Sequence, residues 1–383
     1  MRYIQSPWFR KLGSIVLLSM LCTTFLPVVV AANDSDTANL TVQSSPTATY
    51  RTTQEIHIRH LQKDLELAAQ KPIPFPAPYA DMYLSFTNNL IQPSYAVTQQ
   101  GEVMDLDKGT MLQLDHTIMS KLRTEAAALH AKHYGKLLKW EEIHVLLPKY
   151  AKFTIKDLET GQEFQGQRRA GSSHADVQPL TKADSAIMKK IYGGKWSWLR
   201  RAVLIKHEGS LYAGSMHGMP HGGDGIPDND FKGHFCIHFA GSVTHGNLTL
   251  DTAHQAMTYM AAGQLPDYLA TLTPVQLMEL WTIAINRQDA AIYAAVTGQP
   301  SAKVTTIPFA SAIRTSKPTK KKVDAIQSIA EPFQTTISSQ IRYSLTNAKN
   351  GNKKYGSLEF LMVHPSLPGH WVIQDIHVPS KKK

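Results

Sequence analysis

Two neighbouring stretches, residues 215–223 and 233–239, carry most of the information in this sequence. They read Ser215-Met216-His217-Gly218-Met219-Pro220-His221-Gly222-Gly223 and Gly233-His234-Phe235-Cys236-Ile237-His238-Phe239. Eight of the 17 histidines lie between His174 and His254, so imidazoles are concentrated around a single cysteine. Side chains alternate between the two faces of a strand, and a strand here therefore presents His234, Cys236 and His238 on one face. The pattern predicts a reactive site in this window.

Cys236 is the residue on which that prediction depends. Arg2, Arg10 and Lys11 precede an apolar run that ends in the small residues Val30-Ala31-Ala32, which is typical of a secretory signal peptide over residues 1–32. Its removal takes away Cys22 and leaves one thiol in an exported chain. Imidazoles nearby lower the pKa of a thiol and accept its proton, which favours a nucleophile. The alternative is an inert cysteine buried among Phe235, Ile237 and Phe239.

The window resembles the catalytic motif of the L,D-transpeptidases, the YkuD-type cell-wall enzymes. That motif is a His-Gly pair, a loop, and then Ser/Thr-His-Gly-Cys followed by an apolar residue and usually Arg or Asn. The resemblance places Cys236 on the nucleophile and His234 on the histidine before it. Both His217-Gly218 and His221-Gly222 match the His-Gly pair that carries the general base, and the spacing favours His217. This chain departs from the motif with Gly233 for Ser/Thr, Phe235 for Gly and His238 for Arg.

The resemblance implies acyl transfer on peptidoglycan stem peptides without a cofactor. Cys236 would attack the carbonyl of a diaminoacid–D-Ala bond, and His217 or His221 would take the thiol proton. His234, or backbone N–H groups near Gly233, would stabilise the oxyanion. The expected partner is therefore the peptidoglycan stem peptide, and the expected location is secreted or in the cell envelope.

Two other functions remain open at this point. The first is a zinc-dependent wall-peptide hydrolase, for which His174, Asp176, His221 and His238 form a candidate ligand set, since imidazole and carboxylate suit Zn²⁺. The ligand spacings of known wall-peptide metallopeptidases are not reproduced, so zinc ranks below cysteine catalysis. The second is a non-enzymatic module that binds the envelope through its basic surface.

The remaining sequence predicts a multi-domain chain with three folded parts. After a flexible leader at 33–52, helical spacing over 54–70 and 112–138 predicts a helical N-terminal region at 53–139. Alternating residues and Gly-rich turns predict a mainly-β catalytic-type domain at 140–262, with a helix over 182–191. Helices followed by three strands predict an α+β domain at 268–378, and this order resembles the cone of nuclear-transport-factor-2-like domains.

Composition excludes several classes of protein. The chain has 383 residues, 43% of them hydrophobic, which is enough to bury several cores and excludes a wholly disordered chain. The net charge is +10, but its 40 Lys and Arg are spread along the chain, so no nucleic-acid partner is expected. Beyond the signal peptide no stretch approaches the roughly 20 apolar residues of a membrane span. Nothing in the sequence specifies an oligomeric state.

Overall fold

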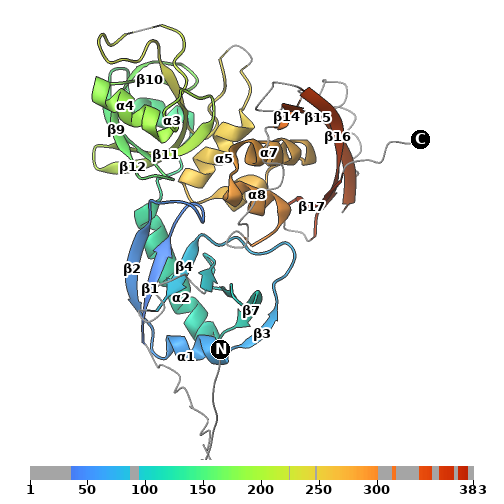
Figure 1. The fold of residues 1–383 in the computed structure, drawn as a ribbon. Coiled ribbons are helices and arrows are strands. Elements are labelled where there is room, and N and C mark those ends of the chain that lie inside the picture. Colours follow the sequence, from blue (N-terminus) through green and yellow to red (C-terminus); the bar gives the residue numbers. More distant parts are fainter. Residues whose placement is uncertain are drawn as a thin grey trace, which may run out of the picture. The chain divides into compact units, whose positions relative to one another are not determined.

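The computed structural model describes residues 36–86, 95–223, 225–245, 248–300, 313–315, 336–346, 353–365 and 370–377. The predicted signal peptide, residues 1–32, lies outside these ranges. The described residues belong to one compact unit of the chain and contain three antiparallel sheets (Figure 1). The protein is mostly β.

The first sheet has seven strands, in the order β2-β1-β4-β5-β6-β7-β3. The strands are β1 (Thr37–Val42), β2 (Thr52–His57), β3 (Ala69–Pro72), β4 (Met82–Ser85), β5 (Tyr95–Val97), β6 (Val103–Asp105) and β7 (Thr110–Gln113). Two helices accompany them, α1 (Leu61–Leu67) and α2 (His116–His133), and α2 packs on β1 and β2. The predicted helical N-terminal region at 53–139 is therefore wrong, and β1 lies inside the predicted flexible leader.

The reason for the error lies in residues 52–57. This stretch pairs residue by residue with β1, for example Ile56 with Ala38, and buries Ile56 almost completely. The β-branched Thr52 and Thr53 suit such a strand. Helical spacing around Leu61 and Leu65 was real, but it extends over only the seven residues of α1. A partner strand that lies elsewhere in the chain overrode the local pattern.

The second sheet is a closed barrel of six strands in the order β10-β13-β12-β11-β8-β9. The strands are β8 (Lys152–Asp157), β9 (Glu163–Ala170), β10 (Ala175–Pro179), β11 (Arg200–His207), β12 (Ser210–His217) and β13 (Phe235–His238). Helix α3 (Trp140–Leu146) precedes the barrel, and α4 (Lys182–Ile191) follows β10 and confirms the helix predicted at 182–191. Side chains from all six strands fill the interior, as in other small barrels.

Alternation along the barrel strands separates the apolar core from the reactive residues. On β13, Phe235 and Ile237 point into the barrel and belong to its core. Cys236 and His238 therefore point to the outer face of the barrel wall. On β10 the neighbours of Asp176, Ala175 and Val177, likewise belong to the core.

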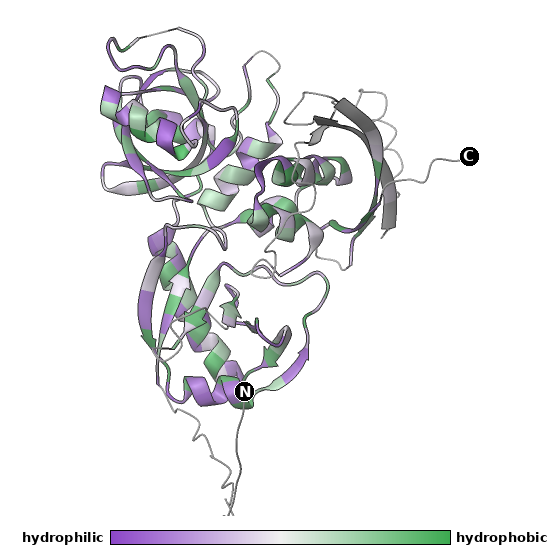
Figure 2. Ribbon diagram, viewed as in Figure 1, coloured by the Kyte–Doolittle hydropathy of each residue, from purple (hydrophilic) through white to green (hydrophobic). Residues whose placement is uncertain are grey.

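The third part begins with four helices and ends with the third sheet. The helices are α5 (Thr252–Ala261), α6 (Leu265–Leu269), α7 (Pro274–Arg287) and α8 (Ala290–Thr297), and the sheet runs β14 (Ile313–Thr315), β15 (Thr336–Thr346), β16 (Lys353–Val363), β17 (Val372–His377). Figure 2 shows hydrophobic residues on α7 and α8, and Trp281 of α7 meets Phe360 of β16 edge-on at 5.1 Å between ring centroids. Helix α5 packs on β11, β12 and β13, so it covers part of the outer barrel face that carries Cys236.

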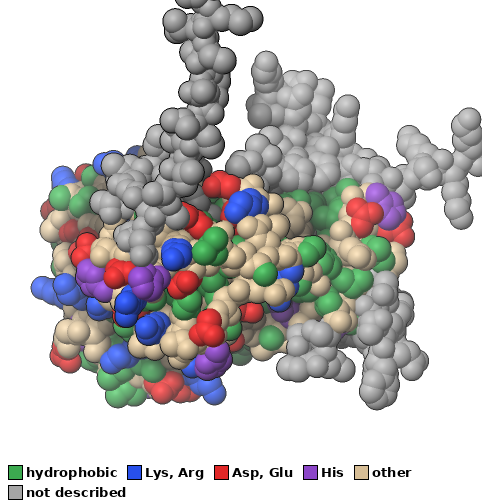
Figure 3. Space-filling view, turned by 90° about the horizontal axis from the view of Figure 1, so that it is seen from below, with side chains coloured by type: hydrophobic (Ala, Val, Ile, Leu, Met, Phe, Trp, Pro, Cys, Tyr) green, Lys and Arg blue, Asp and Glu red, His purple; other side chains and the backbone are tan. Residues whose placement is uncertain are grey.

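Two surface properties bear on partners. None of the described helices combines the length and the apolar character needed to cross a bilayer. On the face shown in Figure 3, positively and negatively charged side chains are interspersed over the described atoms. That face has no continuous basic stripe of the kind that tracks a phosphate backbone.

Candidate functional site

The site is assembled by strand register on the outer face of the barrel. Asp176 of β10 lies directly opposite Cys236 of β13, and His238 lies opposite Ser215 of β12. Directly opposite residues of antiparallel strands have neighbouring side chains on the same face. Three strands that are far apart in sequence thereby bring a carboxylate, a thiol and several imidazoles together.

His221 is the histidine that contacts the thiol. A short antiparallel bridge joins His221 and His234, with backbone N–H···O distances of 3.0 and 2.7 Å, and closes the intervening loop. This places His221 Nε2 at 3.4 Å from Cys236 Sγ. His221 Nδ1 lies 3.1 Å from the carbonyl oxygen of Met219, to which it donates, so Nε2 carries the free lone pair.

His217 lies elsewhere, although the spacing of the motif favoured it. It ends β12, and its Nδ1 accepts the backbone N–H of Met219 at 3.3 Å. Its ring packs on Trp198, 4.7 Å between centroids. The turn at Gly218-Met219-Pro220 carries the chain past the thiol, and the bridge to His234 then selects His221. Of the two candidate bases that the sequence left open, the structure therefore brings His221, and not His217, to the thiol.

Gly233 is required by the same bridge. Its φ is +101°, and a Cβ at this position would lie 2.3 Å from the carbonyl oxygen of His221. A Ser or Thr, which the transpeptidase motif has here, would push the two strands of the bridge apart. This departure from the motif thus has a local structural cause.

Asp176 is the centre of the hydrophilic part of the site. Its Oδ1 lies 3.4 Å from His174 Nε2, 3.6 Å from His234 Nε2 and 3.3 Å from His245 Nε2. Burial raises the pKa of Asp176, but the hydrogen bond from His174 and the neighbouring imidazoles outweigh it and hold the pKa below its ordinary value. Asp176 is therefore a carboxylate at neutral pH.

The environment keeps the Cys236 thiol protonated. The side chain is 3% exposed, and burial raises the pKa of the thiol. The Asp176 carboxylate, with its Oδ1 3.9 Å from Sγ, raises it further. The prediction that flanking imidazoles lower this pKa is wrong, because burial of the thiol and, in addition, a carboxylate on the adjacent strand both raise it.

His245 also belongs to the site, although the local sequence pattern did not single it out. Its Nε2 lies 2.8 Å from His174 Nε2 and 4.0 Å from Cys236 Sγ. The N–H of Val243 donates to the carbonyl oxygen of Ser173, which ties this segment to the start of β10. Its side chain is 55% exposed, so His245 forms the solvent-facing side of the site.

His238 lies on the buried side of the cluster. Its ring stacks on His174 at 4.5 Å and on His254 at 3.8 Å, and its Nδ1 has no hydrogen-bond partner among the described residues. His254 in turn contacts the Ser215 hydroxyl through Nδ1, at 2.9 Å. His238 is therefore separated from the thiol's contacts, although it lies two residues away on the same face.

Donor atoms for a metal ion converge in two overlapping groups of four among the described residues. The atoms of each group lie within 4.8 Å of one another, and the groups are His174, Asp176, Cys236, His245 and His221, His234, Cys236, His245. Of the zinc set expected from the sequence, His174 and Asp176 fall in the first group and His221 in the second. His238 falls in neither, because its ring is stacked inside the cluster.

A shallow pocket of about 440 Å³ reaches the site from solvent. It is lined by Lys149, Arg168, Ala170, Gly171, Ser172, Asp176 and His245. The Arg168 guanidinium donates to four backbone carbonyls, those of His144, Leu147, Ala170 and Gly171. Arg168 therefore holds loops together, and Lys149 is left as the cation that faces the pocket.

No family model and no curated protein matches this chain. The assignment of chemistry therefore rests on the geometry above.

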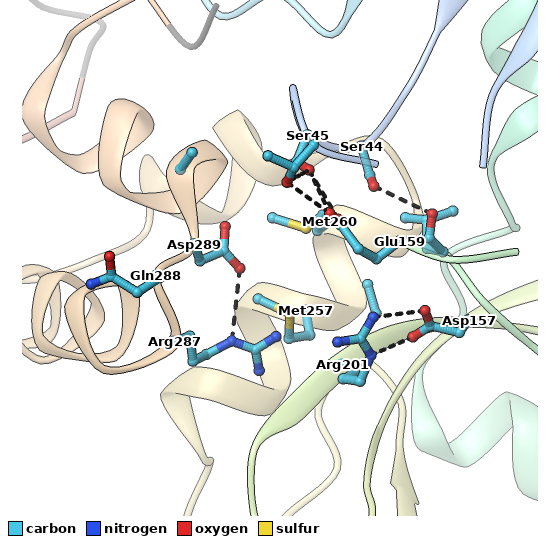
Figure 4. Close-up of a pocket in the computed structure, with 14 residues that line it drawn as sticks. Ser44, Ser45, Asp157, Glu159, Arg201, Met257, Met260, Arg287, Gln288 and Asp289 are labelled. Atoms are coloured by element: carbon cyan, nitrogen blue, oxygen red, sulfur yellow. Dashed lines mark hydrogen bonds and ion pairs between the residues drawn. The ribbon is translucent and has the colours of Figure 1, made fainter. Parts of the chain in front are cut away.

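A second pocket, of about 250 Å³, lies where the barrel meets α5 and the α7–α8 corner (Figure 4). Its charged groups are largely paired: Arg201 makes two bonds to Asp157, and Arg287 faces Asp289 at 3.7 Å. Glu159 accepts hydrogen bonds from the hydroxyls of Ser45 and Thr47. Of these, the Glu159 hydrogen bonds join the barrel to the segment that follows β1.

The buried histidines predict that stability falls in acid. Burial lowers the pKa of His217 to about 2 and that of His254 well below 6.5, with Arg200 and neighbouring imidazoles adding to the effect. The unfolded chain therefore binds protons below pH about 6.5 that the folded chain does not, and stability drops as the pH falls. We expect these two groups to remove about 2 kcal/mol between pH 6 and 5 in urea unfolding.

The variant His254→Gln isolates one of these groups. Its stability should change less steeply with pH than that of the wild type, by about 1.4 kcal/mol per pH unit below pH 6. Equal slopes for the two proteins would contradict the assignment of His254 as a neutral buried imidazole.

Proposed function

We infer that this protein is an exported cell-envelope cysteine acyl transferase of the L,D-transpeptidase type, which acts on peptidoglycan stem peptides. The observation that carries this inference is the 3.4 Å contact between Cys236 Sγ and His221 Nε2, with His221 oriented by the Met219 carbonyl. A nucleophile, a base and a group that orients the base form the arrangement needed for covalent acyl transfer.

Two further features support an enzyme over a binding module. A purely structural cysteine would point into the barrel with Phe235 and Ile237, whereas Cys236 points away from them toward His221 and Asp176. The site also adjoins a pocket open to solvent, which Asp176 and His245 line. Substrate would reach the thiol by displacing the exposed His245 ring.

The proposed reaction has two steps. Cys236 Sγ attacks the carbonyl carbon of the bond between a diaminoacid and D-Ala, while His221 Nε2 takes the thiol proton. The proton then passes to the nitrogen of D-Ala as the C–N bond breaks, which leaves a thioester on Cys236. An acceptor amine attacks the thioester, gives a proton to His221 and releases the thiol, so no cofactor is consumed.

Because the thiol is neutral at rest, His221 acts as a general base during attack rather than as the partner of a preformed ion pair. The oxyanion needs a hydrogen-bond donor beside Sγ. The backbone N–H of His234 is already bonded to His221, but the His234 ring faces the site and lies next to Asp176. We assign the His234 imidazole to this role, and Lys149 in the pocket to a substrate carboxylate.

Alanine variants distinguish the two candidate general bases, His221 and His217. We expect His221→Ala to lower the rate of D-Ala release from a tetrapeptide stem by roughly 10²–10⁴-fold, the usual contribution of general base catalysis. His217→Ala should cost less than about tenfold, because its Nδ1 is engaged by Met219 and not by the thiol. A larger loss in His217→Ala than in His221→Ala would overturn the assignment of the base.

Chelation tests the rival reading. Release by the cysteine route continues in EDTA, whereas a zinc-dependent wall-peptide hydrolase loses activity when its metal is removed. Release that EDTA abolishes and that survives Cys236→Ser would exclude the proposed function in favour of the hydrolase.

A further inference from the structure

Four donor atoms at the site are arranged at the corners of a tetrahedron: His174 Nε2, Asp176 Oδ1, His245 Nε2 and Cys236 Sγ. The three nitrogen and oxygen corners are separated by 3.4 Å (His174–Asp176), 3.3 Å (Asp176–His245) and 2.8 Å (His174–His245). Sγ lies 3.9 Å from Asp176 Oδ1 and 4.0 Å from His245 Nε2. The remaining pair of atoms, His174 Nε2 and Cys236 Sγ, lies within 4.8 Å of each other.

These separations match those of a tetrahedral zinc site. With Zn–N and Zn–O of about 2.0–2.1 Å and Zn–S of about 2.3 Å, adjacent nitrogen and oxygen ligands are about 3.3 Å apart, and sulfur is about 3.6 Å from each. Five of the six separations differ from these values by about half an ångström or less. Side-chain rotation of the exposed His245 accounts for a shift of that size.

The surroundings of the donors are also those of a metal site. His174 Nδ1 lies 2.8 Å from the carbonyl oxygen of Val243, which fixes Nε2 as the ligand nitrogen, as outer-shell carbonyls do for metal-bound histidines. His238 stacks on the other side of the His174 ring and holds its plane. Asp176 is held by register opposite Cys236. Three of the four donors are thus placed by the barrel itself.

We propose that His174, Asp176, Cys236 and His245 bind one Zn²⁺ ion, and that this ion masks the Cys236 nucleophile. The thiol proton is lost when the Zn–S bond forms and passes through His221 Nε2 to solvent, because a coordinating thiol is deprotonated outright. A thiolate bound to Zn²⁺ in a closed set of four protein ligands donates electron density to the metal and is a weaker nucleophile toward an acyl group than a free thiolate. The masking step rests on the proposed function, whereas the metal site stands independently of it.

Metal titration of the full chain tests the site. With Co²⁺ as the probe we expect one ion per chain, and a thiolate-to-cobalt charge-transfer band that is absent in Cys236→Ser. Zn²⁺ should displace Co²⁺. His245→Ala removes an exposed ligand without a buried cavity and should weaken Zn²⁺ binding by more than the roughly 10–100-fold that loss of an outer-shell partner costs. Equal Zn²⁺ affinity in Cys236→Ser and wild type would overturn the proposal.

Matched variants identify the ligand set and control for surface histidines. His57→Ala, at an exposed position in the first sheet, should leave the affinity unchanged. The isosteric Asp176→Asn should weaken Zn²⁺ binding strongly, whereas His221→Gln should weaken it little. Loss of binding in His221→Gln with none in Asp176→Asn would overturn the assignment, because the second group of donors would then hold the ion.

The activity measurement is kept apart from the binding measurement. D-Ala release is followed in EDTA and then during Zn²⁺ titration, and we expect it to fall in parallel with occupancy of the site. Release that persists at saturating Zn²⁺ overturns the masking step. A chain that binds Zn²⁺ as expected but releases no D-Ala in EDTA overturns the proposed function and supports the metal site alone.

Discussion

We expect Cys236→Ser to lower the rate of the proposed acyl transfer by up to roughly 10⁶-fold, which is the loss measured when a hydrolase of the triad type loses its nucleophile. A hydroxyl has a far higher pKa than a thiol, and His221 at 3.4 Å from Sγ has no second base behind it, since its Nδ1 faces a carbonyl rather than a carboxylate. The measurement is D-Ala release from a tetrapeptide stem in EDTA.

The serine side chain is close in shape to cysteine, so the variant should keep the native fold. Measurements of the fold therefore serve as the control for the loss of activity. The far-ultraviolet circular dichroism and the melting temperature of Cys236→Ser should equal those of the wild type. A variant that retains more than about one per cent of the activity, with the fold intact, would remove Cys236 from the reaction.

Replacing Arg201 with methionine costs about 3–5 kcal/mol of folding free energy, because it leaves a buried charge without its partner. Asp157, at the end of β8, is 0% exposed. Arg201 of β11 binds it in two places, through Nε at 2.6 Å and Nη2 at 2.7 Å (Figure 4). The measurement is the guanidinium chloride unfolding curve of each protein.

A surface pair on the same barrel serves as the matched control. Lys156 and Glu163 form an ion pair at 2.7 Å with both side chains partly exposed. Lys156→Met should cost less than about 1 kcal/mol, since water solvates the carboxylate that remains. If Lys156→Met and Arg201→Met destabilise the protein equally, burial of Asp157 is not what makes the Arg201 pair important.

The barrel and the candidate site were predictable to different degrees. Alternating residues and Gly-rich turns indicated the β-rich domain, and a capping Thr181 with Asp184 marks the start of the helix at 182–191. Strand β10 carries no such alternation, because it has only five residues and all of them are buried. The sequence alone therefore did not reveal the role of Asp176, whose position opposite Cys236 depends on strand pairing.

The seven-stranded N-terminal sheet could not be predicted from the local sequence pattern either. Its strands are short, three to six residues each, and its order interleaves β3 with β7 and β1 with β4. Strands of three or four residues are too short to show a period of two, although the six residues of β1 do alternate between buried and partly exposed. The helix α2 was visible, since its buried Leu122, Ala126 and Leu129 recur at helical spacing within one segment.

The sequence by itself determined which reactive groups the window supplies: the Cys236 thiol, histidines two residues to either side, and alternation that puts Phe235 and Ile237 on the opposite face. Tertiary structure alone decided which groups meet that thiol. The β-bridge between His221 and His234 places His221, rather than His217, against the thiol. The register of β10 and β13 places Asp176 beside Cys236 Sγ. Both outcomes depend on hydrogen bonding between separate strands, and burial of the thiol, with the charge of Asp176 adding to it, raises the pKa that the flanking imidazoles were expected to lower.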